Sequence, residues 1–197
     1  MNVLIVLSHP DPASFNHALA AAIAQGLRSA GHAAELADLH VESFDPRQNL
    51  DDVRALHGQG PLPPALVREQ LRLARADRLV FVYPTWWFER PAMLKGWCDR
   101  VLTSGFAFRF GPSGPEGMLA AKCVWIVTTT GMPEPFYARH GGFESILRPM
   151  IAGTLGICGI AAPKLTPLFS LPFMPPAART AALAEVQAQA AQWCAPA

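Results

Sequence analysis

The chain has 197 residues, of which 51% are hydrophobic and 16% charged, a composition that excludes a disordered or fibrous protein. A chain of this length buries roughly 70% of its unfolded surface, so one core forms without disulfides or a structural metal. Sixteen basic and fifteen acidic residues leave a net charge of +1, which offers no electrostatic basis for binding nucleic acid. The 19 prolines and 15 glycines are a mild excess, concentrated after residue 110.

The N-terminal segment and the cysteines bear on the compartment. The first basic residue is Arg28, so the apolar segment 3–7 lacks the basic region and cleavage site of a signal peptide. The most apolar later stretch, 149–163, is shorter than the ~18–20 residues of a membrane span. We therefore expect a cytoplasmic protein without a transmembrane segment. The four cysteines show neither a CxxC pair nor a metal-site spacing, so we expect them to be reduced and mostly buried. They are Cys98, Cys123, Cys158 and Cys194.

Hydrophobic periodicity predicts strands and helices in alternation. Continuous apolar runs, typical of strands buried on both faces, occur at 2–8 and 78–83. Helical spacing of apolar residues begins at Phe15 and ends before Gly31. Residues 45–64 are polar and rich in turn residues, which indicates a surface connection. The other predicted strands are 33–39, 122–130 and 157–163, and the other predicted helices are 66–76, 91–102, 143–155 and 176–193.

Repeated strand–helix units indicate one domain over residues 1–197, built on a doubly wound parallel sheet with right-handed crossovers. Ligands of such sheets bind beyond the carboxyl ends of the strands, where the winding changes direction. The loops that leave those ends are 8–16, 83–91 and 128–142, so we expect the functional site among them. The proline-rich stretch 163–176 has two open interpretations, a dimer contact or a wall of the pocket.

The first of these loops opens the first helix. Asp11 or Ser14 can cap that helix, and either cap leaves free backbone N–H groups at the loop. Such a helix N-terminus binds anions, and the side chains of His9, Ser14 and Asn16 add uncharged donors. The loop contains neither GxGxxG nor GxxxxGK[ST], which excludes a Rossmann dinucleotide fingerprint and a P-loop. The alternative is that these side chains only cap the helix.

Aromatic residues dominate the second loop, and hydroxyls the third. Trp86, Trp87 and Phe88 carry a large apolar area, which needs a flat ligand, a partner subunit or an aromatic core cluster to cover it. Threonine hydroxyls followed by Gly131 suit a close backbone approach to a ligand. Tyr137 and His140, three residues apart, have two interpretations: a hydrogen-bonded relay that stabilises developing negative charge, or a histidine that is only solvated in its loop. Their position at the same sheet edge as the other two loops favours the relay.

Taken together, the loops resemble those of the flavodoxin-like NAD(P)H:quinone oxidoreductases. The matching motifs are His9 with Ser-Phe-Asn at 14–16, the segment 84–101, and Thr-Thr-Gly at 129–131 before a tyrosine and His-Gly. The resemblance runs from residue 1 to about residue 179. It implies a flavodoxin-like five-stranded parallel sheet in the order 2-1-3-4-5, with helices on both faces. It also implies a flavin enzyme, usually a homodimer whose active sites lie at the subunit interface.

The resemblance implies a role for each matching residue. The flavin's phosphate chain is held by His9, Ser14, Phe15 and Asn16. The cofactor-binding set around the isoalloxazine ring is Pro84, Thr85, Trp86, Trp87, Phe88, Thr128, Thr129, Thr130, Gly131 and Tyr137. Tyr137 and His140 are the catalytic pair beside the N1–O2 edge of the ring. Arg179 matches a basic residue of FAD-binding relatives, which favours FAD over FMN. The aromatic segment that caps the substrate pocket from the partner subunit is Phe106, Phe108 and Phe110.

The activity implied by the resemblance is ping-pong hydride transfer, in which NAD(P)H reduces the flavin at N5 and a quinone-like acceptor then takes the hydride. Two alternatives are an ancillary subunit of a potassium efflux system and a flavodoxin-type electron carrier. Such carriers are strongly acidic, so the net charge of +1 argues against the second. The chain departs from the family in a short loop before His140, in Glu89-Arg90 and in Phe110, which affects the expected substrate preference more than the cofactor.

Overall fold

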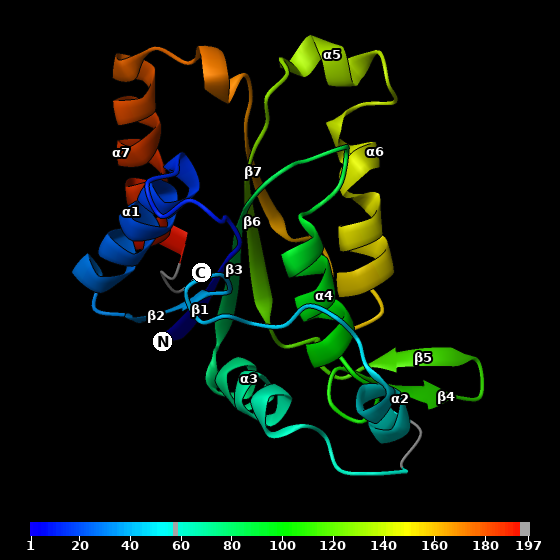
Figure 1. Ribbon diagram of the computed structural model, residues 1–197. Coiled ribbons are helices and arrows are strands. Elements are labelled where there is room, and N and C mark those ends of the chain that lie inside the picture. The colour runs from blue at the N-terminus through cyan, green and yellow to red at the C-terminus, as the bar shows by residue number, and fades with distance from the viewer. Residues whose placement is uncertain (57–58, 194–197) are drawn as a thin grey trace.

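The computed structural model describes residues 1–56 and 59–193, and a five-stranded parallel sheet lies at its centre between two layers of helices (Figure 1). The strand order is β2-β1-β3-β6-β7. An antiparallel hairpin precedes β6 in the chain, so the expected order 2-1-3-4-5 describes the sheet when the hairpin strands are not counted. The sheet strands are β1 (Asn2–Leu7), β2 (Ala33–Asp38), β3 (Arg78–Pro84), β6 (Cys123–Thr129) and β7 (Lys164–Leu168), and the hairpin strands are β4 (Phe108–Gly111) and β5 (Gly114–Gly117).

Helices cover both faces of the sheet. One face carries α1 (Phe15–Ser29) and α7 (Pro176–Trp193) (Figure 1). The opposite face carries α3 (Pro64–Arg75), α4 (Ala92–Val101), α6 (Phe143–Arg148) and the π-helix η1 (Pro149–Leu155) that continues α6. The short elements outside these layers are α2 (Leu50–Leu56), α5 (Glu134–Ala138) and the 3-10 turn η2 (Leu171–Phe173).

The core is split into two layers by the alternation of side chains along the central strands. In β1, Leu4 and Val6 are buried under α3 and α4, whereas Ile5 and Leu7 are buried under α1 and α7. Because β1, β3 and β6 are covered on both faces, they have the continuous apolar runs that made them recognisable. Helix α1 approaches α7 closely at Gly26, where a Cβ atom would lie 2.1 Å from the Gln187 carbonyl oxygen.

The prediction of a fifth strand at 157–163 is wrong. The edge strand is β7, and residues 156–163 form a turn in which Gly159 and Ala162 have positive φ. Cys158 and Ile160 are still buried, so the apolar run fills the core from a turn rather than from a strand. Partial exposure of β7 at the sheet edge explains its mixed sequence, which includes a proline that an edge position tolerates.

Three further expectations need correction or completion. The connection 45–64 contains the helix α2. Arg100 of α4 donates two hydrogen bonds, of 2.8 and 3.1 Å, to the Asp52 carboxylate of α2, and these bonds hold the two helices together. The β4–β5 hairpin was not predicted, because its strands are only four residues long. Cys123 is exposed, whereas Cys98 and Cys158 are buried, and Cys194 lies outside the described residues.

Within the described part of the chain, we find no helix with the length and apolarity to cross a membrane.

Candidate functional site

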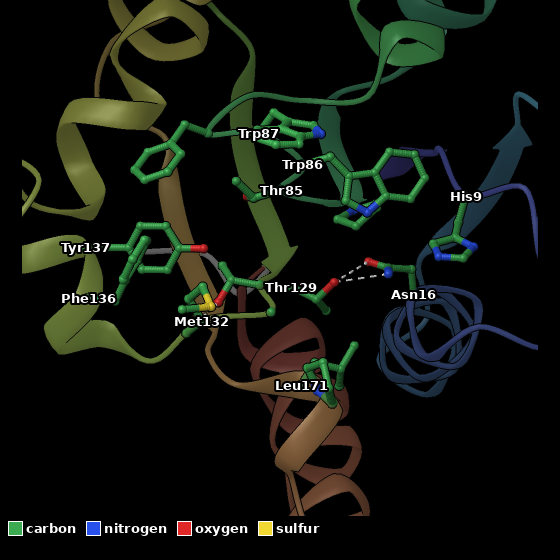
Figure 2. A pocket seen from close by; sticks show the side chains of 15 residues that line it. His9, Asn16, Thr85, Trp86, Trp87, Thr129, Met132, Phe136, Tyr137 and Leu171 are labelled. Atoms are coloured by element: carbon green, nitrogen blue, oxygen red, sulfur yellow. Dashed lines mark hydrogen bonds between the residues drawn. The ribbon is translucent and has the colours of Figure 1, made fainter.

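A cavity of about 560 Å³ lies at the carboxyl ends of β1, β3 and β6, where the sequence predicts the site. Figure 2 shows His9 and Asn16 at one end, Phe136 and Tyr137 at the other, and the two tryptophans along one wall. All three predicted loops contribute to the lining, which is mainly apolar. The lining residues are His9, Asn16, Pro84, Thr85, Trp86, Trp87, Phe88, Thr129, Thr130, Gly131, Met132, Phe136, Tyr137, Leu171 and Pro172.

The aromatic wall rests on a tight turn. Trp86 and Glu89 exchange two backbone hydrogen bonds, of 2.9 and 3.0 Å, around the central residues Trp87 and Phe88. Both central residues have positive φ, 49° and 63°, a conformation that bulky side chains rarely adopt. Trp87 is 96% exposed, so no packing within the chain compensates for this backbone. Such strain at a cavity is typical of functional segments, in which the geometry serves a ligand.

Threonine hydroxyls brace the strand ends behind the cavity. The Thr128 hydroxyl hydrogen-bonds that of Thr85 at 2.9 Å, which links β6 to β3. Asn16 donates from Nδ2 to Thr129 Oγ1 at 3.1 Å, which links α1 to β6 (Figure 2). Thr130 donates to the Met132 carbonyl at 2.8 Å. These bonds satisfy the buried hydroxyls and hold the three loops in one arrangement.

Backbone donors at the cavity have no partner among the described residues. They are the N–H groups of Trp87, Phe88, Gly131 and Met132, which lie in the loops that line the cavity. His9 adds a side-chain donor. Its Nδ1 accepts the Asp11 N–H at 3.1 Å, so the proton of neutral His9 is on Nε2. Burial lowers the pKa of His9 and favours this neutral form.

Tyr137 and His140 lie close to the aromatic turn and are joined by a backbone hydrogen bond of 2.9 Å, from the His140 N–H to the Tyr137 carbonyl oxygen, but their side chains do not hydrogen-bond each other. Tyr137 is buried against Phe88, with ring centroids 5.6 Å apart, and its hydroxyl points into the cavity (Figure 2). His140 is exposed, and its Nδ1 pairs with the Phe136 carbonyl oxygen at 2.8 Å, not with Tyr137. The predicted hydrogen bond between the two side chains is therefore absent. Their positions beside Phe88 keep a shared catalytic role as a prediction.

Several predicted residues lie behind the cavity wall. Ser14 caps α1, and Phe15 begins it. Thr128 supports Thr85 as described above. Arg179 donates to the carbonyl oxygens of Leu171 and Met174, and its guanidinium lies 5.9 Å from the centroid of the Phe15 ring. Arg179 thus connects the 3-10 turn η2 to the start of α1.

The three phenylalanines of the hairpin region do not reach this cavity within one chain. Phe108 and Phe110 line a second cavity, of about 410 Å³, with residues of α4 and η1, and Phe106 packs against the core. Phe110 is 76% exposed.

Sequence reasoning missed four lining residues. Met132 and Phe136 lie in a loop that we had singled out for other residues, and Leu171 and Pro172 come from the proline-rich stretch. The pocket-wall interpretation of residues 163–176 is therefore confirmed at Leu171 and Pro172. No group of three or more His, Cys, Asp or Glu side chains in residues 1–56 and 59–193 is placed to hold a metal.

Comparison with known proteins assigns the family. A family with a flavodoxin-like fold matches residues 1–194. The NAD(P)H dehydrogenase [quinone] 1 of Cavia porcellus is 33% identical over 92% of this chain and 73% of its own length. The chain belongs to the flavodoxin-like NAD(P)H:quinone oxidoreductase family. Another member, the ribosyldihydronicotinamide dehydrogenase [quinone] of Pongo abelii, is 32% identical over 83% of this chain and 80% of its own length.

Two solved structures have the same fold over nearly the whole length of this chain. The NAD(P)H:quinone oxidoreductase of Methanothermobacter marburgensis has a TM-score of 0.87 and 29% identity, and the match covers 98% of both chains. The Smu.1420 protein of Streptococcus mutans has a TM-score of 0.85 and 31% identity, over 98% of this chain and 100% of that one. The described chain is thus an oxidoreductase of this family, and the predicted resemblance is confirmed.

The cavity has the features that a flavin requires. Flat aromatic walls suit a tricyclic ring, and the unpaired N–H groups suit the carbonyl and nitrogen atoms along its polar edge. The N–H groups of Phe15 and Asn16, at the start of α1, have no partner among the described residues and suit a phosphate. The residues present therefore fit the cofactor that the fold and the relatives imply.

Proposed function

We propose that the protein is a flavin-dependent NAD(P)H:quinone oxidoreductase. The observation that carries the proposal is the strained, exposed Trp87–Phe88 turn beside backbone donors that have no partner within the described chain. When bound against Trp87, Phe88 and the Gly131 loop, a flavin would supply the redox chemistry, namely hydride transfer from NAD(P)H to a quinone-like acceptor in two half-reactions.

The chain's own groups bind and orient. The indole of Trp87 and the ring of Phe88 provide apolar faces, and the N–H groups of Gly131 and Met132 stabilise negative charge at the polar edge of a planar ligand. The Tyr137 hydroxyl points toward the same space (Figure 2), so it is available to donate there. His140 lies beside Phe88, with ring centroids 5.8 Å apart, and in this proposal it shares the catalytic role of Tyr137.

We propose a homodimer in which the partner subunit covers the cavity. Trp87 and Phe110 are large and highly exposed, and exposed aromatic groups of this size favour an interface. Phe106, Phe108 and Phe110 belong to the hairpin region, which does not reach the cavity of its own chain. In this proposal, Phe108 and Phe110 close the acceptor side of the partner's cavity.

We further propose FAD as the cofactor and the cytoplasm as the compartment. Arg179, which matches a basic residue of FAD-binding relatives, holds η2 against the start of α1, where the N–H groups of Phe15 and Asn16 suit a phosphate. Cys98, Cys123 and Cys158 form no disulfide among the described residues, as is usual in a reducing compartment.

The test is purification followed by an absorbance spectrum and mass analysis of the released cofactor. Stoichiometric FAD, oxidation of NADH or NADPH that depends on added 1,4-benzoquinone, and parallel double-reciprocal plots support the proposal. A protein that binds neither FAD nor FMN when either is supplied would refute it. Substitution Tyr137→Phe should slow reduction of the bound flavin in a single turnover, with flavin content unchanged. Sedimentation of the wild-type protein tests the dimer directly.

A further inference from the structure

A hydrogen-bonded chain of three side chains lies at the start of α1. His17 Nδ1 is 2.8 Å from Ser14 Oγ, and His17 Nε2 is 2.8 Å from Asp38 Oδ2. Asp38 is at the end of β2, and its other oxygen accepts the backbone N–H groups of His40 and Val41. His17 is 17% exposed and Asp38 9%, so both hydrogen bonds are largely shielded from water.

The partners determine where the protons are. An ionised Asp38 carboxylate accepts only, so His17 donates its Nε2 proton to it. In neutral His17 the Nδ1 atom is then a bare acceptor, and the Ser14 hydroxyl must donate its single proton to it. The Ser14 oxygen also accepts the His17 N–H at 3.4 Å. In this state Ser14 has no proton to donate to a ligand.

Protonation of His17 reverses this arrangement. Both ring nitrogens then donate, Nδ1 to Ser14 and Nε2 to Asp38, which releases the Ser14 hydroxyl proton. Ser14 is the N-cap of α1, and the next two N–H groups, of Phe15 and Asn16, are unpaired within the described residues. An anion bound by those two groups comes within reach of the Ser14 hydroxyl.

We infer that the phosphate-bearing part of the flavin binds together with a proton, which His17 takes up as Ser14 turns its hydroxyl proton to the ligand. The inference rests on the proposed function, because it deepens the same site. The protein's affinity for the anionic flavin then decreases as the pH rises, whereas its affinity for the bare ring system does not change.

The other titratable groups around His17 do not replace it as the proton acceptor. Asp38 from β2 accepts hydrogen bonds from His17 and from the backbone N–H groups of His40 and Val41. The ring of His9, in the loop after β1, lies 6.4 Å from that of His17, and burial lowers the pKa of His9, which favours its neutral form. His40 and Asp11 lie near His9, and Asp11 is in the same loop. Among the titratable side chains of the described residues, only that of His17 hydrogen-bonds Ser14.

The experiment compares FAD with riboflavin, which has no phosphate. Each is titrated into flavin-free protein between pH 6 and 8.5, with the dissociation constant taken from flavin fluorescence. FAD is the better anionic probe because the terminal phosphate of FMN itself titrates near about pH 6. For FAD the dissociation constant should rise by up to about tenfold per pH unit, and for riboflavin it should stay constant. Calorimetry in two buffers with different ionisation enthalpies should show proton uptake with FAD alone.

Variants test whether the pH dependence of FAD affinity comes from the side chains of Ser14, His17 and Asp38 or from the overall charge of the protein. His17→Gln still donates to Asp38 but cannot take a proton, so its FAD affinity should not vary with pH. His32→Gln, beyond the other end of α1, should behave as the wild type does. Ser14→Thr should keep the pH dependence and the proton uptake, and Ser14→Ala should reduce both.

The two proposals fail in different ways. If FAD binds to the wild type with an affinity that does not vary with pH and without proton uptake, this inference is wrong and the proposed function stands. The same holds if His17→Gln retains the full pH dependence. If FAD, FMN and riboflavin all fail to bind at every pH, the proposed function fails, and the inference fails with it.

Discussion

Replacing Trp87 with glycine should stabilise the flavin-free protein and weaken its binding of flavin. With φ at 49°, the tryptophan occupies a left-handed conformation that is unfavourable by about 1–2 kcal/mol for a residue with a Cβ atom. Glycine relieves this strain but makes the unfolded chain more flexible, which offsets about 0.5–1 kcal/mol. Because the side chain is 96% exposed, almost no buried apolar area is lost. The expected net gain is about 0.5–1 kcal/mol.

The effect on binding has the opposite sign. An indole that covers roughly 100 Å² of a flat ligand contributes about 2.5 kcal/mol. Its loss raises the dissociation constant for flavin by close to two orders of magnitude. Ser43→Gly is the matched control, because Ser43 has φ of 53°, is exposed and lies away from the cavity. It should gain similar stability and bind flavin normally.

The assays are urea unfolding of flavin-free protein at one fixed concentration and titration of flavin fluorescence. A flavin-free Trp87→Gly variant that is less stable than the wild type, beside a stabilised Ser43→Gly variant, would refute the strain argument for this turn. Unchanged flavin affinity would show that Trp87 does not cover the ligand.

Three other predictions concern the fold and its titratable groups. Asp52→Ala leaves the buried Arg100 guanidinium without its carboxylate partner and should reduce the free energy of unfolding by about 3–5 kcal/mol in urea titrations; a loss below 1 kcal/mol would contradict this. Burial raises the pKa of Cys98 to about 12, so alkylation of the native protein at pH 8 should label the exposed Cys123 before the buried Cys98, as peptide mass spectrometry can check. The lowered pKa of His9 means that the unfolded state binds a proton more readily; stability should therefore fall as the pH drops below about 6.5, and less so in His9→Gln.

The location of the cavity was predictable because it depends on local signals. Buried parallel strands have continuous apolar sequences, and the rule for doubly wound sheets then points to the loops at their carboxyl ends. Trp86 and Thr129 were found in this way, and both line the cavity. The fifth strand was predicted at the wrong place. Periodicity cannot distinguish an apolar turn such as 156–163 from a buried strand, and the actual strand, β7, is half-exposed at the edge and lacks a continuous apolar run.

Features that depend on distant contacts were not accessible from the sequence. Leu171 reaches the cavity because the chain turns back after β7, and no periodic pattern encodes that direction. The bond of His17 to Asp38 joins residues 21 positions apart, from a helix and a strand, and neither residue stands out in its own segment. His140 was placed in a relay from its spacing to Tyr137, whereas local geometry directs its Nδ1 to a backbone carbonyl.

Much of the polar recognition surface of the cavity is main chain. The N–H groups at positions 87, 88, 131 and 132 are present whatever side chains these residues carry, provided that none of them is proline. Selection can therefore alter the side chains of these loops while the pattern of donors is preserved. Insertion or deletion of a single residue is different, because it redirects every donor that follows. The length of the turn at 86–89 and the placement of positions 131 and 132 directly after β6 should therefore be constrained among relatives as distant as those at 33% identity, whereas the rest of the loop up to His140 can change in length.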